Sequence, residues 1–192
     1  MNLARVITEA APSVRWHIGK ILTKVLYRKA FLVLGQGTVI VQPLRLRGLE
    51  RVSVGERCAI YEGVWLEAEQ AAKLTIGDDV YLGHDVHLHA IDDVTIGAGT
   101  MMTDGVLVSA GLHILKDGMR PAGSGPITIG SGCFIGQRSI VLGGVTIGDG
   151  VTIGAGSVVT RDVPAGATAA GVPARILRDP LATAVTTSPG RD

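Results

Sequence analysis

The sequence predicts an all-β protein in which short parallel strands wind into about six triangular coils. Three observations indicate this fold: aliphatic residues recur every six positions, the 192-residue chain contains 27 glycines, and only 4% of its residues are aromatic. A helix has a period of 3.6 residues and a simple strand a period of two, so neither explains a period of six. Three short strands joined by tight turns do explain it, with one flat side of the coil for each hexad.

The six-residue period holds at eighteen positions, all of them aliphatic or Met. Taken in threes, they are the predicted inward positions of each coil: Leu34, Ile40 and Leu46; Val54, Ile60 and Leu66; Ile76, Leu82 and Leu88; Ile96, Met102 and Val108; Ile129, Ile135 and Val141; Ile147, Ile153 and Val159. Stacked coils cover one another's strand edges. We therefore expect an N-terminal helical segment over residues 1–33, a β-helix domain over 34–178 and a disordered tail over 179–192.

Every departure from the six-residue period follows the third hexad of a coil. Two extra residues follow Leu46, four follow Leu66, two follow Leu88 and fifteen follow Val108. All insertions are therefore predicted to leave from one corner of the prism. The longest forms a projecting loop near residues 112–128, and we expect this arm to reach a neighbouring chain.

The amino-terminal segment is predicted to be helical over residues 2–29, with a break near Pro12. Ile18, Ile21, Leu22 and Val25 share an apolar face beside basic residues. Such a helix can cap the open end of the coil, or it can lie on an anionic membrane as a basic amphipathic helix. Both interpretations stay open, so peripheral membrane contact through residues 1–29 is one of the predictions.

The net charge, the apolar runs and the cysteines indicate which partners and which cellular location to expect. A net charge of +1 argues against a nucleic-acid partner, which requires a concentrated basic face. No apolar run is long enough to span a membrane, and no cleavable signal is recognisable. Cys58 and Cys133 occupy equivalent positions three coils apart, too far for a disulfide. We expect a cytoplasmic protein with reduced core cysteines, at most peripheral to the inner face of the membrane.

A family resemblance lies in the final repeats, PITIGSGCFIGQRSIVLGGVTIGDGVTIGAGSVVTRDVPAGATAAGVPARIL, residues 126–177. This segment resembles the ending PI-x-IG-x-x-V-W-IG, GVTIG, IGAGS-V-V-T-K-D and G-x-PA-K/R of bacterial hexapeptide-repeat acyltransferases, and most of all the sugar and polysaccharide O-acetyltransferases. The resemblance covers residues 34–178. It implies a left-handed parallel β-helix, acetyl-CoA as co-substrate, a carbohydrate acceptor and a homotrimer with active sites between subunits.

The resemblance also implies a catalytic base at His113, the last residue of the hexad VSAGLH before the arm. A histidine has a suitable pKa for removing a hydroxyl proton near neutral pH. In many relatives this segment reads S-D-H-x-H, whereas here Ala110 and Gly111 replace the Asp and the first His. One coil earlier, Asp93 occupies the equivalent position, and we expect it to orient His113. The alternative for Asp93 is a solvated turn.

Further site residues follow from the same match. The positions that match coenzyme A contacts are Gln137 and Ala155 for the thioester and pantetheine, Thr160, Arg161 and Arg175 for the phosphates, and Gly171 and Pro173 for the adenine end. Phe134 replaces the family's Trp and is expected to form an aromatic wall of the acceptor pocket. His87 and His89 are expected on the outer face of one strand, where they can contact sugar hydroxyls.

The leading prediction is direct transfer of acetyl from acetyl-CoA to a sugar hydroxyl, with His113 as general base. A sugar N-acyltransferase is the alternative within the enzyme class. His84, His87 and His89 resemble a zinc-binding segment of γ-class carbonic anhydrases, which share the fold. No histidine lies between His17 and His84, so we predict no metal site. An inactive scaffold stays a further alternative, because two residues of the S-D-H-x-H segment are replaced.

Overall fold

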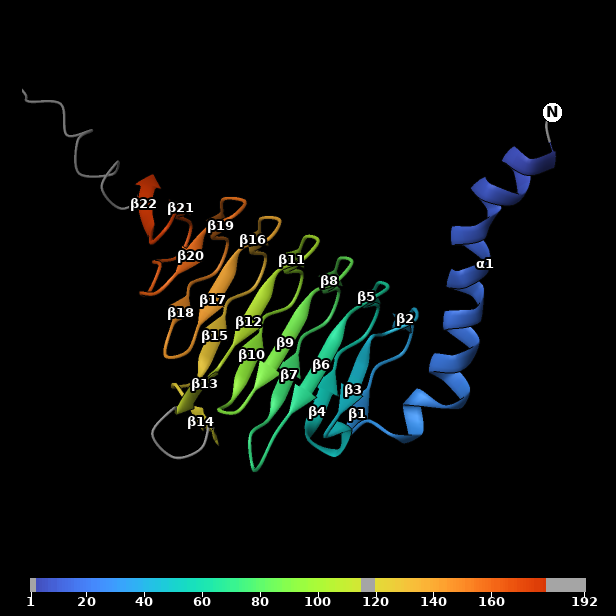
Figure 1. Ribbon diagram of the computed structural model, residues 1–192, viewed down its shortest axis with the longest axis horizontal. Helices are drawn as coiled ribbons and strands as arrows, with labels where there is room; N and C mark the ends of the chain where they lie inside the picture. The colour runs from blue at the N-terminus through green and yellow to red at the C-terminus, as the bar shows by residue number, and fades with distance from the viewer. Residues whose placement is uncertain (1–2, 115–119, 179–192) are drawn as a thin grey trace, which may run out of the picture.

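The computed structural model describes residues 3–114 and 120–178 of the chain. Three sheets form the three sides of a triangular prism with about six coils, and their strands are parallel except for the last, β22 (Ala174–Arg178), which pairs antiparallel with β21 (Thr168–Gly171) (Figure 1). The predicted left-handed parallel β-helix is confirmed. Within the described residues, the helix α1 (Leu3–Val25) lies at one end of the prism, and the last strands lie at the other.

Each sheet takes one strand from each of the six coils, and the second sheet has two further strands at its carboxyl-terminal end. The first sheet contains β1 (Val33–Leu34), β4 (Val52–Val54), β7 (Leu74–Ile76), β10 (Val94–Ile96), β15 (Ile127–Ile129) and β18 (Thr146–Ile147). The second contains β2 (Val39–Ile40), β5 (Ala59–Ile60), β8 (Tyr81–Leu82), β11 (Met101–Met102), β16 (Phe134–Ile135), β19 (Thr152–Ile153), β21 (Thr168–Gly171) and β22 (Ala174–Arg178). The third contains β3 (Arg45–Arg47), β6 (Trp65–Ala68), β9 (His87–Ala90), β12 (Leu107–Ser109), β17 (Ile140–Leu142) and β20 (Val158–Val159).

The strand register stacks the predicted aliphatic positions in three columns. In the second sheet, for example, Ile40 pairs with Ile60 and Ile60 with Leu82, and the column continues through Met102. Seventeen of the eighteen positions are buried, whereas Leu46 in the first coil is partly buried. The core is therefore a continuous stack of aliphatic side chains, as the six-residue period predicts.

Two adjacent methionines allow the contributions of the core and of the surface to the free energy of unfolding to be compared. Met102 is 0% exposed inside the prism, and Met101 is 42% exposed on its outer face. Met102→Ala is expected to lower the free energy of unfolding by about 2–5 kcal/mol, because it leaves a cavity. The control Met101→Ala is expected to change it by about 0.5 kcal/mol or less. Equal losses for both variants in denaturant unfolding would contradict this account of the core.

All insertions leave the prism at the corner between the third and first sheets, as predicted. The short helix η2 (Leu49–Arg51) follows β3, and the longest insertion forms an antiparallel hairpin of β13 (Gly111–Ile114) and β14 (Arg120–Gly123). Figure 1 shows this hairpin projecting from the lower edge of the prism. Its base is held by Asp92, whose Oδ2 accepts a hydrogen bond from the Gly125 amide at 2.7 Å.

The two cysteines are buried and form no disulfide. Each thiol lies 3.1 Å from a backbone carbonyl of the next coil, Cys58 from Gly77 and Cys133 from Gly148. Burial raises the pKa of both thiols. The predicted core positions of both cysteines are therefore confirmed.

The thiols give a pH-dependent prediction. A raised pKa keeps each thiol neutral in the folded state, so above the ordinary thiol pKa of about 8.5 the folded protein binds more protons than the unfolded chain. Stability is therefore expected to fall as the pH rises from 8 towards 10, and Cys58→Ser with Cys133→Ser should remove that part of the slope. Native protein should also react with a thiol reagent much more slowly than unfolded protein. Rapid labelling of the native chain would contradict the burial.

The helix α1 runs without interruption from Leu3 to Val25, so the predicted break near Pro12 is wrong. A proline removes one backbone hydrogen bond, which can bend a helix without ending it. A single turn of 3-10 helix, η1 (Tyr27–Lys29), follows. None of the described helices is long and apolar enough to cross a bilayer.

The helix packs on the first two coils through a threonine, a glycine and a tryptophan. The Thr23 hydroxyl accepts a hydrogen bond from the Ile40 amide of edge strand β2 at 2.9 Å. A Cβ atom on Gly19 would lie 2.9 Å from the Ile40 carbonyl oxygen, so only glycine permits this approach. The Trp16 ring packs on Tyr61, with their centroids 5.5 Å apart. The face of α1 that covers the coil is therefore not the predicted apolar face.

Candidate active site

The arm places His113 in β13, where it pairs with Pro121 of β14. The side chain of His113 lies outside the described part of the chain. The two positions where this chain departs from the S-D-H-x-H segment are tightly packed. Ala110 is fully buried, and a Cβ atom on Gly111 would lie 2.3 Å from the Ile91 side chain. Small residues therefore suit the start of this arm sterically.

The carboxylate of Asp93 accepts a hydrogen bond from the Lys73 amide at 2.8 Å. The residues stacked on Asp92 and Asp93 come from the segment that leads from β14 into β15, because the Gly125 amide donates to the Asp92 carboxylate and the Ile127 amide donates to the Asp93 carbonyl oxygen. A pocket of about 390 Å³ opens beside both carboxylates at the base of the arm. The orientation of His113 by Asp93 stays a prediction.

A second pocket, of about 420 Å³, brings together three residues of the predicted site. Phe134, Gln137 and Ala155 all line it, with Tyr81 and Asp104. It lies where the second sheet turns into the third. Phe134 is 42% exposed on the outer face of β16, so the ring is available as a wall of the pocket. Burial raises the pKa of the Tyr81 hydroxyl, which stays a neutral hydrogen-bond donor.

The backbone of this pocket offers two hydrogen-bond donors. Consecutive turns stack closely here, because the Gly156 amide donates to the Gln137 carbonyl oxygen at 2.8 Å and a Cβ atom on Gly136 would lie 2.5 Å from the Ala155 nitrogen. Neither the Gln137 nor the Ala155 amide donates a hydrogen bond to another described residue. Two amides without a protein acceptor at an exposed turn can bind the carbonyl groups of a ligand.

The predicted phosphate-binding cations also share a pocket. Arg161 and Arg175 line a hollow of about 260 Å³ at the carboxyl-terminal end of the prism. Thr160 is exposed next to Arg161. Gly171, with a φ of +104°, ends β21, and Pro173 lies in the exposed turn before β22. Two exposed guanidinium groups beside one hollow provide a suitable site for anionic groups.

His87 and His89 lie on the outer face of the third sheet, as predicted, but protein side chains already contact them. The ring of His87 packs on the Trp65 ring, with their centroids 5.2 Å apart. Nε2 of His89 lies 3.5 Å from a Glu69 carboxylate oxygen. Their contact with a sugar acceptor stays a prediction.

The residue on this face that the sequence analysis missed is Glu67, which is 2% exposed. Its carboxylate accepts hydrogen bonds from the Trp65 indole at 2.7 Å and from Arg47 at 3.1 Å, and Arg45 lies within 3.5 Å. A signal was present, because Arg47, Glu67 and His89 are one coil apart in the register. Ligand atoms of Glu67, Glu69 and His89 lie within 4.8 Å of one another, but the two arginines already neutralise Glu67 and oppose a cation there.

The comparisons with known proteins agree with this fold. The family model described as "Hexapeptide repeat of succinyl-transferase" matches residues 126–161. The galactoside O-acetyltransferase of Escherichia coli strain K12 is 37% identical over 127 residues, which are 62% of this chain and 62% of the relative. The putative lipopolysaccharide biosynthesis O-acetyl transferase WbbJ of the same organism is 29% identical over 82% of this chain and 83% of its own length.

These matches confirm the predicted resemblance to hexapeptide-repeat acyltransferases of sugar and polysaccharide pathways. This hexapeptide-repeat protein spans about three fifths of the length of the first curated relatives that it matches. Among solved structures, AntD, an N-acyltransferase from Bacillus cereus in complex with dTDP and 3-hydroxybutyryl-CoA, has a TM-score of 0.72 at 20% identity, over 85% of this chain and 92% of AntD. PerB from Caulobacter crescentus, in complex with CoA and GDP-perosamine, has a TM-score of 0.56 at 27% identity, over 82% of this chain and 66% of PerB.

Proposed function

We propose that this hexapeptide-repeat protein transfers an acetyl group from acetyl-CoA to a hydroxyl of a sugar or surface-polysaccharide precursor. The observation that carries the proposal is the pocket lined by Phe134, Gln137 and Ala155, in which the Gln137 and Ala155 amides donate to no other described residue. The relatives named as sugar and lipopolysaccharide O-acetyltransferases support it. The CoA-bound structure of PerB supports coenzyme A as the acyl carrier.

In the proposed reaction, His113 acts as general base. It takes the proton from the acceptor hydroxyl while the hydroxyl oxygen attacks the thioester carbonyl carbon. The backbone amides supply hydrogen bonds to carbonyl oxygens of the donor. Collapse of the tetrahedral intermediate breaks the carbon–sulfur bond, and the departing thiolate takes the proton back from His113. Asp93 is proposed to orient the imidazole, with Asp93→Asn as the variant that tests this role.

The positions of the arm and the pocket support an active site shared between chains. The hairpin leaves at the corner between the third and first sheets, whereas Gln137 and Ala155 lie at the corner between the second and third. One whole side of the prism separates these corners. We therefore propose a homotrimer in which His113 of one chain meets the amide pocket of its neighbour.

A sugar N-acyltransferase is the second candidate, and the N-acyltransferase AntD, which shares the fold, favours it. The test is thiol release from acetyl-CoA with a panel of sugars and amino sugars, followed by mass spectrometry of the product. An O-acetyl ester is removed by mild base and an N-acetyl amide is not. Base-stable products alone would overturn O-acetylation, and no thiol release with any acceptor would count against the enzyme class. Cytoplasmic location is also our proposal, supported by the two unpaired cysteines.

A further inference from the structure

The helix α1 carries an apolar stripe that no described part of the chain covers. Its members are 37% to 62% exposed: Val14, Ile18, Ile21, Leu22 and Val25. They lie opposite Trp16, Gly19 and Thr23, three residues that contact the first two coils. One face of α1 therefore packs on the prism, and the other face exposes large apolar side chains. An exposed apolar patch of this kind is typical of a surface that binds a partner or a membrane.

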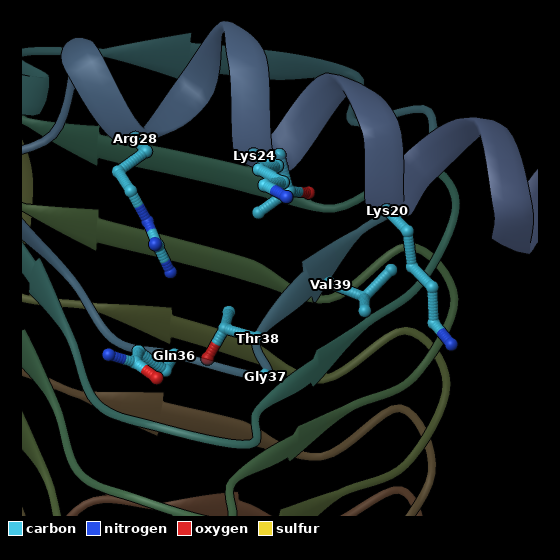
Figure 2. Close-up of a pocket in the computed structure, with 8 residues that line it drawn as sticks. Lys20, Lys24, Arg28, Gln36, Gly37, Thr38 and Val39 are labelled. Atoms are coloured by element: carbon cyan, nitrogen blue, oxygen red, sulfur yellow. The ribbon is translucent and has the colours of Figure 1, made fainter.

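A basic pocket adjoins this stripe. Lys20, Lys24 and Arg28 extend from the helix and η1 over the turn at Gln36 to Thr38, around a hollow of about 260 Å³ (Figure 2). No carboxylate lines the hollow, and none of the three cations forms an ion pair with another residue in the described ranges. Among the described residues, Arg28 donates only to the carbonyl oxygen of Gly35, at 3.2 Å.

The sequence around the pocket is strongly one-sided in charge. Residues 10–49 contain seven Lys and Arg and no Asp or Glu. Three neighbouring cations without a carboxylate attract anions, and lysine stems can lie along apolar surface while their ammonium groups stay among polar groups. The chemistry of this surface therefore matches phosphate groups located beside an apolar phase.

We propose that α1 docks this protein on a bilayer containing anionic phospholipids. The apolar stripe enters the boundary between headgroups and acyl chains, and Lys20, Lys24 and Arg28 bind lipid phosphates along its flank. A second copy of the chain fits this surface less well, because a symmetric contact would bring two sets of three cations together. Membrane docking does not depend on the acyl transfer reaction. Failure to bind vesicles would therefore say nothing against the proposed reaction.

The test is co-sedimentation of the full chain with vesicles of phosphatidylcholine alone or with phosphatidylglycerol added. We expect binding to the anionic vesicles that weakens with salt. Lys20→Gln with Lys24→Gln should weaken it about 25-fold, since each cation near the surface contributes about fivefold. The matched control is Lys73→Gln, an exposed lysine on another coil, which should bind as the unmodified chain. Ile21→Gln with Val25→Gln, at exposed positions, should abolish binding without changing the thermal unfolding temperature.

Several results would overturn the proposal. The first is equal sedimentation with neutral and anionic vesicles, and the second is unchanged binding by the lysine variant. A smaller oligomer for Ile21→Gln with Val25→Gln, measured by light scattering, would assign the stripe to contacts between copies. Loss of vesicle binding in inorganic phosphate, but not in chloride of equal ionic strength, would show that the pocket prefers a soluble anion.

Discussion

His113→Ala is expected to lower the rate of acetyl transfer by about 10²–10⁴-fold, the usual contribution of a positioned general base. The loss should appear in kcat, because the imidazole acts on the proton that moves in the transition state and need not hold the ground-state substrate. The low-pH limb of the pH–rate profile, which reports titration of the base, should flatten in the variant. The measurement is thiol release from acetyl-CoA with the best acceptor of the sugar panel.

A matched control for this variant is His17→Ala. His17 is exposed on α1, and the one hydrogen bond of its ring among the described residues is with the Ser13 carbonyl oxygen, at 2.7 Å. It should retain the full rate. Undiminished turnover by His113→Ala would contradict the general-base mechanism, whatever the identity of the acceptor.

Arg161→Gln with Arg175→Gln is expected to raise the KM for acetyl-CoA by about 10–100-fold, because charge-assisted hydrogen bonds to phosphate are lost. Both side chains are exposed beside one hollow, so their loss should not affect folding. The acetyl thioester of pantetheine, which lacks the nucleotide phosphates, should be used equally well by the variant and the unmodified chain. Arg178→Gln, an exposed cation of the same strand outside the hollow, is the control. An equal loss with both thioesters would show that the arginines do not bind phosphate.

The two sets of variants also test the shared site. If His113 of one chain acts on acetyl-CoA held by its neighbour, refolding the His113 variant together with the double arginine variant should restore some active sites. Each restored site then combines an intact arm with an intact phosphate hollow. A mixture no more active than its components would indicate that each chain builds its own site or that the trimer does not form.

Much of the fold follows from the sequence because the repeat is local. Within one hexad, a single inward residue and a tight turn decide the geometry, so counting from Leu34 placed every column of the core in register. The same counting located the corner of the arm, since insertions can leave only where the six-residue spacing fails. The pocket around Phe134, Gln137 and Ala155 was harder to predict from the sequence. Its residues were predicted by resemblance, but their assembly depends on consecutive turns stacking at one corner.

The sequence by itself determined the prism, its three aliphatic columns and the corner from which the arm departs. Only the tertiary structure decided that Glu67 is buried and paired with two arginines, because Arg45 and Arg47 lie on β3 and Glu67 lies one coil later, on β6. It also decided which face of α1 packs on the prism. Hydrophobic periodicity favours the face of Ile18 and Val25, yet Gly19 and Thr23 make the contact. The reason is that β2 is the edge strand of its sheet, so the Ile40 amide has no neighbouring strand on that side and needs another acceptor. Thr23 supplies the acceptor, and Gly19 permits the helix to approach closely enough.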